Sequence, residues 1–425
     1  MPSWLLLFAL ALPAAAAPPE MERELAGVVD LFYDMQFDQA RAASDALAAL
    51  RPDHPAGPFY RSVSSYQRWI AEGMRSAATY RAFQADNDAA EHAARALMRS
   101  NPAEAHYYLG AALGFRARAN AAQRNFLRAL PDGASAIRHL KKALALDPAL
   151  SDARLGMGMY HYFAARMPAA AKPFASLLIG ESADRALGLA ELWSVAKSTG
   201  IARMEARSIL SVILSKDDEA DWAGAEMLLA ELSARYPHNP IYRLRRAYVA
   251  ERRGDFDAAV ALADPNGLWF ESLHPTVRAP ARAWALYRAA ENRLLQDRPA
   301  ETAGWLAALD TMPHPRGMKD WVLLRRANLL DAQGKVREAD KLYERVNDKT
   351  PATLAALDRL PQPRGLKDWA LLRRANLLDF QGKTREADRL YGQIKDKTPK
   401  RLAERFLQDR YPAGPKDAAP FFTGY

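Results

Sequence analysis

Residues 315–351 read PRGMKDWVLLRRANLLDAQGKVREADKLYERVNDKTP, and residues 363–399 read PRGLKDWALLRRANLLDFQGKTREADRLYGQIKDKTP. The similarity aligns residues 305–351 with residues 353–399 at an offset of 48, and 34 of the 47 aligned positions are identical. Each copy contains an apolar stretch at helical spacing, a glycine that interrupts it, and a second amphipathic stretch that ends before a proline. This order predicts a pair of helices joined by a turn in each copy.

The spacing inside each copy resembles the tetratricopeptide repeat (TPR), a helical hairpin of about 34 residues. In the first copy, Ala327 is the small residue at the helix crossing and Gly334 ends the first helix. Ala339 is the alanine of the second helix, and Pro351 closes the hairpin. The second copy repeats all four 48 residues later. Small side chains let two helices approach closely, and proline cannot continue the helix that it follows.

Weaker copies of the same spacing precede residue 300. Four alanines, Ala40, Ala90, Ala136 and Ala225, stand 12 residues before a proline, and 10 residues beyond each of those prolines stands a small residue: Ser62, Ala112, Gly158 and Ala247. The resemblance therefore implies six to eight hairpins over residues 22–412. The predicted fold is all-α, a right-handed superhelical solenoid of TPR-like hairpins.

We expect four segments along the chain. Residues 1–17 form a signal peptide, and residues 18–300 form a degenerate TPR-like solenoid with an irregular insert near 156–200. Residues 301–412 hold the two 48-residue copies, and residues 413–425 are a flexible tail that ends in aromatic residues. The degenerate repeats and the N-terminal segment together resemble TPR proteins of the exported bacterial type.

The N-terminal segment carries the apolar run WLLLFALAL, followed by small residues that suit a signal peptidase. The run is too short to span a bilayer as a helix, and no comparable run follows it. We therefore expect export to the periplasm or the cell exterior, and no transmembrane span in the mature chain.

Charge is distributed unevenly in the 425-residue chain. The net charge is +9, and residues 311–425 hold 24 Lys and Arg against 15 Asp and Glu, so this part carries the whole excess. A basic part of this kind allows peripheral association with the cell envelope, although interspersed charges also suit a solvated surface. We expect no nucleic-acid partner, because aromatic residues do not interleave with the basic ones.

Catalytic and metal-binding motifs are missing from the sequence. There is no Cys, no G-x-S-x-G, no H-E-x-x-H and no phosphate-binding glycine loop, and none of the 8 His residues forms a pair at metal-ligand spacing. We therefore expect no enzyme activity, no metal and no cofactor.

The TPR resemblance implies that the first helices of the hairpins line a concave groove for a protein or peptide partner. The groove positions fall in the two copies and in one earlier hairpin: Trp321, Leu324, Asn328, Asp331, Trp369, Leu372, Asn376, Asp379, Tyr248 and Glu251. Asn could bind a peptide backbone and Trp could offer an apolar platform. In the alternative interpretation, Trp fills a helix seam and Asn faces water.

An Arg-Arg-Ala triplet recurs three times, with its first arginine at Arg245, Arg325 and Arg373. We expect this first arginine to lie in solvent and the second to run its stem along the helix seam.

The stretch from Gly156 to Gly200 is poor in charge, and Tyr160, Phe163 and Leu178 lie in it. These residues could line a pocket for a lipid or another apolar ligand, whereas their helical spacing also suits a buried core. The leading functional hypothesis is an exported, non-catalytic scaffold that binds proteins through its concave helical face. The alternative is a carrier of an apolar ligand.

Overall fold

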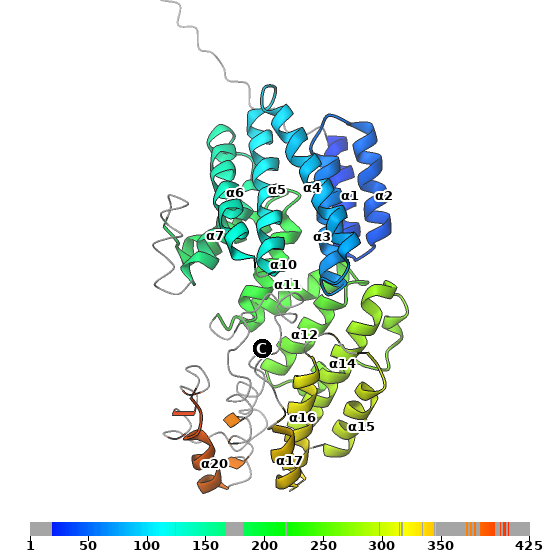
Figure 1. Ribbon diagram of the computed structural model, residues 1–425, viewed down its shortest axis with the longest axis vertical. Coiled ribbons are helices and arrows are strands. Elements are labelled where there is room, and N and C mark those ends of the chain that lie inside the picture. The colour runs from blue at the N-terminus through cyan, green and yellow to red at the C-terminus, as the bar shows by residue number, and fades with distance from the viewer. Residues whose placement is uncertain are drawn as a thin grey trace, which may run out of the picture. The chain divides into compact units, whose positions relative to one another are not determined.

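The computed structural model describes residues 19–123, 125–166, 182–216, 219–296, 298–313, 315, 318–333, 335–343 and 345, and single residues and short stretches between 371 and 407. Within this part every regular element is a helix (Figure 1). The all-α fold class is therefore confirmed. The predicted signal peptide and tail, residues 1–17 and 413–425, lie outside the described residues.

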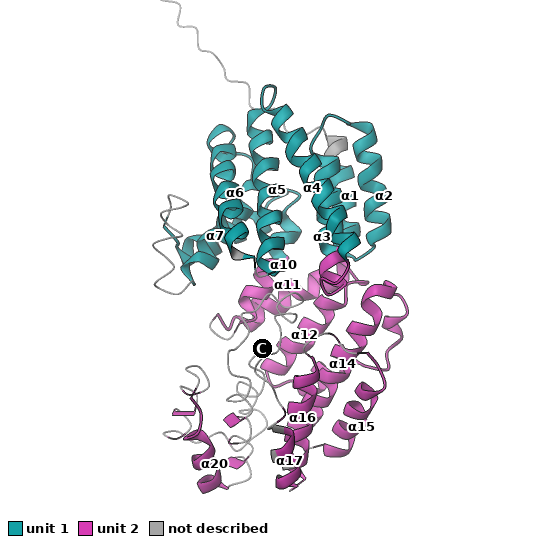
Figure 2. Cartoon of the chain, in the orientation of Figure 1, with its two compact units in different colours: residues 1–67, 77–207 teal, residues 68–76, 208–425 magenta. Residues whose placement is uncertain are grey.

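The helices divide into two compact units, shown in different colours in Figure 2. Unit 1 comprises residues 1–67 and 77–207, and unit 2 comprises residues 68–76 and 208–425. The following helices begin in unit 1: α1 (Pro19–Tyr33), α2 (Phe37–Leu50), α3 (Ala56–Ala71), α4 (Ala77–Leu97), α5 (Pro102–Ala122), α6 (Phe126–Leu146), α7 (Ala153–Ala165), α9 (Arg185–Lys197) and α10 (Arg203–Leu214). Of these, α3 and α10 end in unit 2.

The helices of unit 2 that follow are α11 (Trp222–Arg235), α12 (Pro240–Arg252), α13 (Phe256–Ala263), the 3-10 turn η1 (Leu268–Phe270), α14 (Pro275–Leu295), α15 (Pro299–Asp310), α16 (Met318–Ala332), α17 (Val336–Tyr343) and α20 (Thr384–Tyr391). The first 48-residue copy thus supplies the hairpin α16–α17. Of the second copy, α20 and a few residues before it are described.

Short polar residues determine where many helices begin. The side chains of Asn101, Asp184, Asp221, Asn239 and Asp255 each accept a hydrogen bond from a backbone N–H in the first turn of the helix that follows. Such caps satisfy donors that have no partner within the helix. In α5 and α12 a proline stands in the first turn, where its missing N–H costs nothing.

Neighbouring helices pack in the order of the sequence. The described pairs include α1 with α2, α5 with α6, α7 with α9, α12 with α13, α14 with α15, and α16 with α17. Several of these pairs also pack on the next helix along the chain, as α6 does on α7 and α13 does on α14. This arrangement agrees with the predicted succession of hairpins.

The small residues expected at helix crossings are buried. Ser62, Ala112, Ala247 and Ala327 have no exposed surface, and the corresponding alanines of the second helices are buried as well: Ala40, Ala90, Ala136, Ala225, Ala259 and Ala339. Each position therefore lies where two helices meet, for the packing reason on which the prediction rested.

A close crossing joins α7 to α9. A Cβ atom added at Gly188 would lie 2.8 Å from the carbonyl oxygen of Gly158 and 2.9 Å from the Cα atom of Tyr162. Glycine at position 188 is therefore needed for these two backbones to pack as they do. Residues 167–181, the central part of the predicted irregular insert, lie outside the described residues.

No described helix is both long and apolar enough to cross a membrane.

Candidate functional site

The first helices of three successive hairpins in unit 2 lie side by side, since α14 packs against both α12 and α16 (Figure 1). A chain of charged side chains runs across them. Arg288 of α14 pairs through Nη1 with Glu251 Oε1 of α12 at 3.4 Å and with Glu291 Oε2 at 3.2 Å. Arg325 of α16 donates from Nη2 to Glu291. We call these four residues the ionic ladder.

Hydrogen bonds and aromatic rings support the ionic ladder. Asn292 donates from Nδ2 to Glu251 Oε2 at 2.8 Å. The guanidinium group of Arg288 lies 4.8 Å from the ring centre of Tyr248. The guanidinium group of Arg325 lies 5.3 Å from the ring centre of Tyr287. Cation–π contacts of this kind are strongest where water is excluded.

The ionic ladder is enclosed in protein. Glu251 has no exposed surface, and Glu291 and Arg325 are each 2% exposed. Burial, together with the nearby charge of Glu291, raises the pKa of Glu251 to about 7. Charges at this depth are retained only when each has a partner, because removal from water costs several kcal/mol per ion.

Two side chains of α16, Arg325 of the ionic ladder and Asn328, have hydrogen-bonding groups without partners among the described residues. Both polar atoms of the Asn328 carboxamide are buried and unpartnered, and so are Nε and Nη1 of Arg325. Buried polar groups are nearly always hydrogen-bonded, and exceptions point to water or a ligand. This face of α16 can therefore accept a molecule that offers both carbonyl oxygens and N–H groups.

The structure brings together half of the predicted groove residues. Tyr248 and Glu251 of α12 lie with Trp321, Leu324 and Asn328 of α16 around the same α14 helix, and all five are buried. Leu372 and Asp379 of the second copy are also buried, and Asp379 accepts a hydrogen bond from Tyr391 at 2.9 Å. The side chain of Asp331 and the whole of Trp369 and Asn376 lie outside the described residues.

Sequence reasoning missed the contribution of α14. Arg288 and Glu291 belong to the ionic ladder and Asn292 supports it, yet no groove residue was predicted on α14, although Ala263, Pro275 and Ala285 repeat the alanine, proline and small-residue spacing there. The available signal was Arg288-x-x-Glu291-Asn292, three polar groups on one side of a helix rich in alanine.

The prediction that the first arginine of each Arg-Arg-Ala triplet lies in solvent was wrong for the two triplets that are described. The first arginine, Arg245 or Arg325, is buried, whereas the second is partly exposed. Arg246 donates from Nη2 to Glu226 at 2.8 Å, and Arg326 pairs with Asp310. For Arg325 the physical reason is that it faces α14, where Glu291 and Tyr287 compensate its burial.

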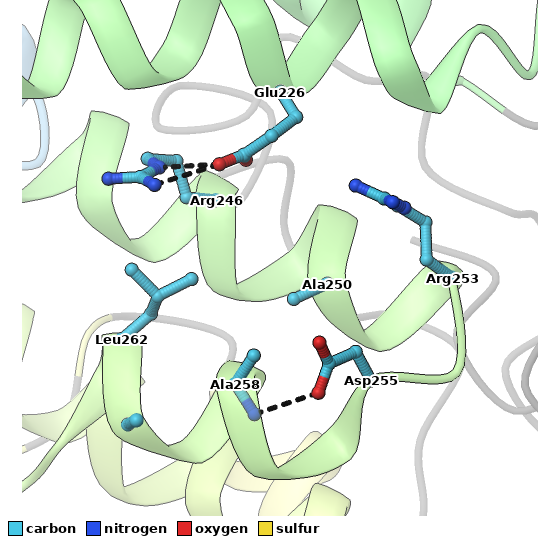
Figure 3. A pocket seen from close by; sticks show the side chains of 8 residues that line it. Glu226, Arg246, Ala250, Arg253, Asp255, Ala258 and Leu262 are labelled. Atoms are coloured by element: carbon cyan, nitrogen blue, oxygen red, sulfur yellow. Dashed lines mark hydrogen bonds and ion pairs between the residues drawn. The ribbon is translucent and has the colours of Figure 1, made fainter.

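An open pocket of about 620 Å³ lies elsewhere in unit 2, between α11, α12 and α13 (Figure 3). Its floor is apolar and includes Ala250, Ala258 and Leu262. Arg253 points into it from the end of α12, while Asp255 is engaged in capping α13. None of the groove residues predicted from the sequence lines this pocket.

The residues predicted for an apolar ligand are only partly placed. Tyr160 and Phe163 are half-buried on α7, and Leu178 lies outside the described residues. The hypothesis of an apolar carrier therefore stays a prediction. Among the described residues, no cluster of three or more His, Cys, Asp or Glu side chains could hold a metal ion.

No known protein family matches this sequence, and no curated protein is detectably similar to it.

Proposed function

We propose that this chain is a non-catalytic helical-repeat scaffold that binds a segment of a partner protein along the first helices of unit 2. The observation that carries the proposal is the pair of buried side chains with unpartnered polar atoms, Asn328 and Arg325. A peptide backbone presents a carbonyl oxygen and an N–H group at each residue, which matches the donors and the acceptor of a carboxamide. The TPR resemblance supports the same face.

The burial of these groups sets a condition on the proposal. Asn328 is 1% exposed and Arg325 is 2% exposed, so the face is closed in the free chain. A partner must open it before it can bind. We therefore expect association to be slower than for a preformed groove, because binding includes a conformational change.

The test is affinity capture from a cell-envelope extract with the mature chain from residue 18, compared with Asn328→Leu. Leucine has nearly the shape of asparagine and needs no hydrogen bonds, so the variant should be at least as stable as the original chain. We expect the partner to be lost although stability does not fall. Equal capture by both chains would contradict the proposal. Recovery of bound lipid with no captured protein would favour the alternative, a carrier of an apolar ligand.

Arg253→Glu provides the matched control at the open pocket. We expect this variant to capture the same partner as the unchanged chain, because none of the described residues that line the pocket belongs to the ionic ladder. Loss of capture in Arg253→Glu alone would move the binding site to the pocket.

We further propose that the scaffold acts outside the cytoplasm, at the periphery of the cell envelope. The signal-like residues 1–17 and the basic excess of residues 311–425 support this location. N-terminal sequencing of the protein recovered from the envelope fraction tests it, with Pro18 expected as the first residue.

A further inference from the structure

Two histidines that lie 33 positions apart meet between α5 and α6 in unit 1. The Nδ1 atoms of His106 and His139 are 2.7 Å apart, and the ring centres are 4.9 Å apart with an angle of 37° between the planes. A separation of 33 residues is no metal-ligand spacing, so the pair was not predicted from the sequence. Packing of the α5–α6 hairpin creates it.

The two helices hold the imidazoles in place. A Cβ atom at Gly110, one turn beyond His106, would lie 2.8 Å from Cδ2 of Leu140 and 3.0 Å from the carbonyl oxygen of Ala136. The backbones therefore approach closely next to the histidine pair. His106 is buried and His139 is partly exposed, so one edge of the pair faces water.

Both imidazoles are poised to be neutral at pH 7. Burial lowers the pKa of His106, with a further contribution from Lys142. Burial also lowers the pKa of His139, followed by the effects of His106, Arg138, Arg95 and Lys142. In a neutral pair at this distance one Nδ1 donates its proton to the lone pair of the other.

We propose that His106 and His139 bind a divalent copper ion through their two Nδ1 atoms. The ion takes the place of the proton that lies between the two Nδ1 atoms, and that proton moves to Nε2 of its own ring through water. Each imidazole then carries its single proton on Nε2, so the pair neither gains nor loses a proton overall. Neutral imidazole is a preferred ligand of copper, and Cu²⁺ leads the divalent first-row ions in affinity for nitrogen ligands.

The distance between the nitrogens favours a square-planar ion. Two ligands bound at about 2.0 Å and at right angles are about 2.8 Å apart, whereas a tetrahedral ion separates them by about 3.3 Å. The observed 2.7 Å agrees with the first value. Zinc would have to spread the two rings from their observed separation.

The charges that face the pair are cationic, and each is exposed. Arg95 of α4 pairs with Glu91 at 2.9 Å and is 60% exposed. Arg138 of α6 donates to Ser135 at 3.1 Å, and Lys142 is exposed one turn further. Solvent screens such charges, so they weaken the site without preventing binding. Water supplies the remaining ligands of the ion.

The test is titration of the full mature chain with Cu²⁺, followed by visible absorption and by electron paramagnetic resonance, which counts the bound nitrogens. We expect one equivalent of copper with two imidazole nitrogens. His106→Gln and His139→Gln should each weaken this binding at least tenfold. His92→Gln, at an exposed histidine of α4, is the control and should bind copper as the original chain does.

Circular dichroism shows whether each variant keeps its helices. If His106→Gln loses helical content, copper binding by the His139→Gln variant is the deciding measurement, because His139 is partly exposed. Copper binding that is unchanged in a folded His139→Gln variant overturns the proposal. A signal with one bound nitrogen in the original chain also overturns it, and so does tighter binding of Zn²⁺ than of Cu²⁺.

Discussion

The arginine at position 325 shows how much a single buried charge depends on its partners. Its large side chain is fully buried in unit 2, and it is paired with the equally buried Glu291. Replacing one member of such a pair strands the other in a medium of low polarity. We expect Arg325→Met to lower the free energy of unfolding by about 3 to 5 kcal/mol.

Urea unfolding followed by circular dichroism measures this loss, and the neighbouring arginine provides the control. Arg326 pairs with Asp310 at the surface, where both side chains are partly exposed. Arg326→Met should therefore cost about 1 kcal/mol or less. Equal losses in the two variants would show that the ionic ladder has no special energetic role.

Glu205 of α10 gives a second prediction for a single residue, in unit 1. Its carboxylate accepts hydrogen bonds from Tyr33 and, at 3.1 Å, from Nη1 of Arg118. Burial nevertheless raises its pKa to about 7 from the ordinary value of 4.5. Between these two values the folded state binds a proton that the unfolded state has released, so stability falls as pH rises from about 4.5 to about 7.

We expect Glu205→Gln to remove part of this pH dependence. At pH 4 the variant and the original chain should be about equally stable, because Glu205 is then protonated in both states. At pH 8 the variant should be more stable by about 3 kcal/mol. Unfolding curves across this range measure the difference, and a difference that does not change with pH would contradict the assignment.

At the scale of the helix, the α7–α9 crossing makes a sharp prediction for glycine. Gly188→Ala places a methyl group against the backbone of α7, which cannot move away as a flexible side chain could. We expect the melting temperature to fall by several degrees, equivalent to a loss of about 1 to 3 kcal/mol. Gly27→Ala in α1 is the matched control, because nothing lies within 4 Å of the added carbon.

The control should be stabilised by about 0.5 to 1 kcal/mol, since alanine favours the helix more than glycine does. Differential scanning calorimetry compares the two variants directly. Stabilisation by both substitutions would show that α7 and α9 pack less closely than the structure has them.

The helices and their crossings could be predicted from the sequence because both depend on local spacing. Small residues such as Ala112 and Ala247 stand at fixed distances from prolines, and the structure buries them as expected. The partners of polar groups could not be predicted in this way. Arg325 meets Glu291, and His106 meets His139, only because separate helices pack in one particular rotation about their axes.

Some residues of the candidate site could be predicted from the repeat spacing, and others could not. Tyr248, Glu251 and Asn328 were named from the positions that the TPR resemblance implies; they are buried on α12 and α16, the two helices that pack on α14. The α14 residues that join them were missed, although Ala263, Pro275 and Ala285 repeat the spacing of the other hairpins there, because that spacing does not show which polar side chains a helix carries. A repeat pattern identifies equivalent positions, whereas the chemistry between positions depends on side chains that vary from one hairpin to the next.

For the whole molecule, the division into two compact units leads to a prediction about cooperativity. Each unit has its own buried residues, such as Leu192 in unit 1 and Leu324 in unit 2. In arrays of helical hairpins, stability is a sum over hairpins and their neighbours, so a long array need not unfold in one step. We expect the calorimetric enthalpy of unfolding to exceed the van't Hoff enthalpy.

Two of the substitutions above distinguish the units within that transition. Gly188→Ala alters unit 1 and Arg325→Met alters unit 2, and each should shift a different part of the unfolding curve. Their effects should add in the double variant, because the two positions share no partner. A single transition that both substitutions shift as a whole would mean that the units unfold together. The ionic ladder would then stabilise the whole chain rather than the unit that contains it.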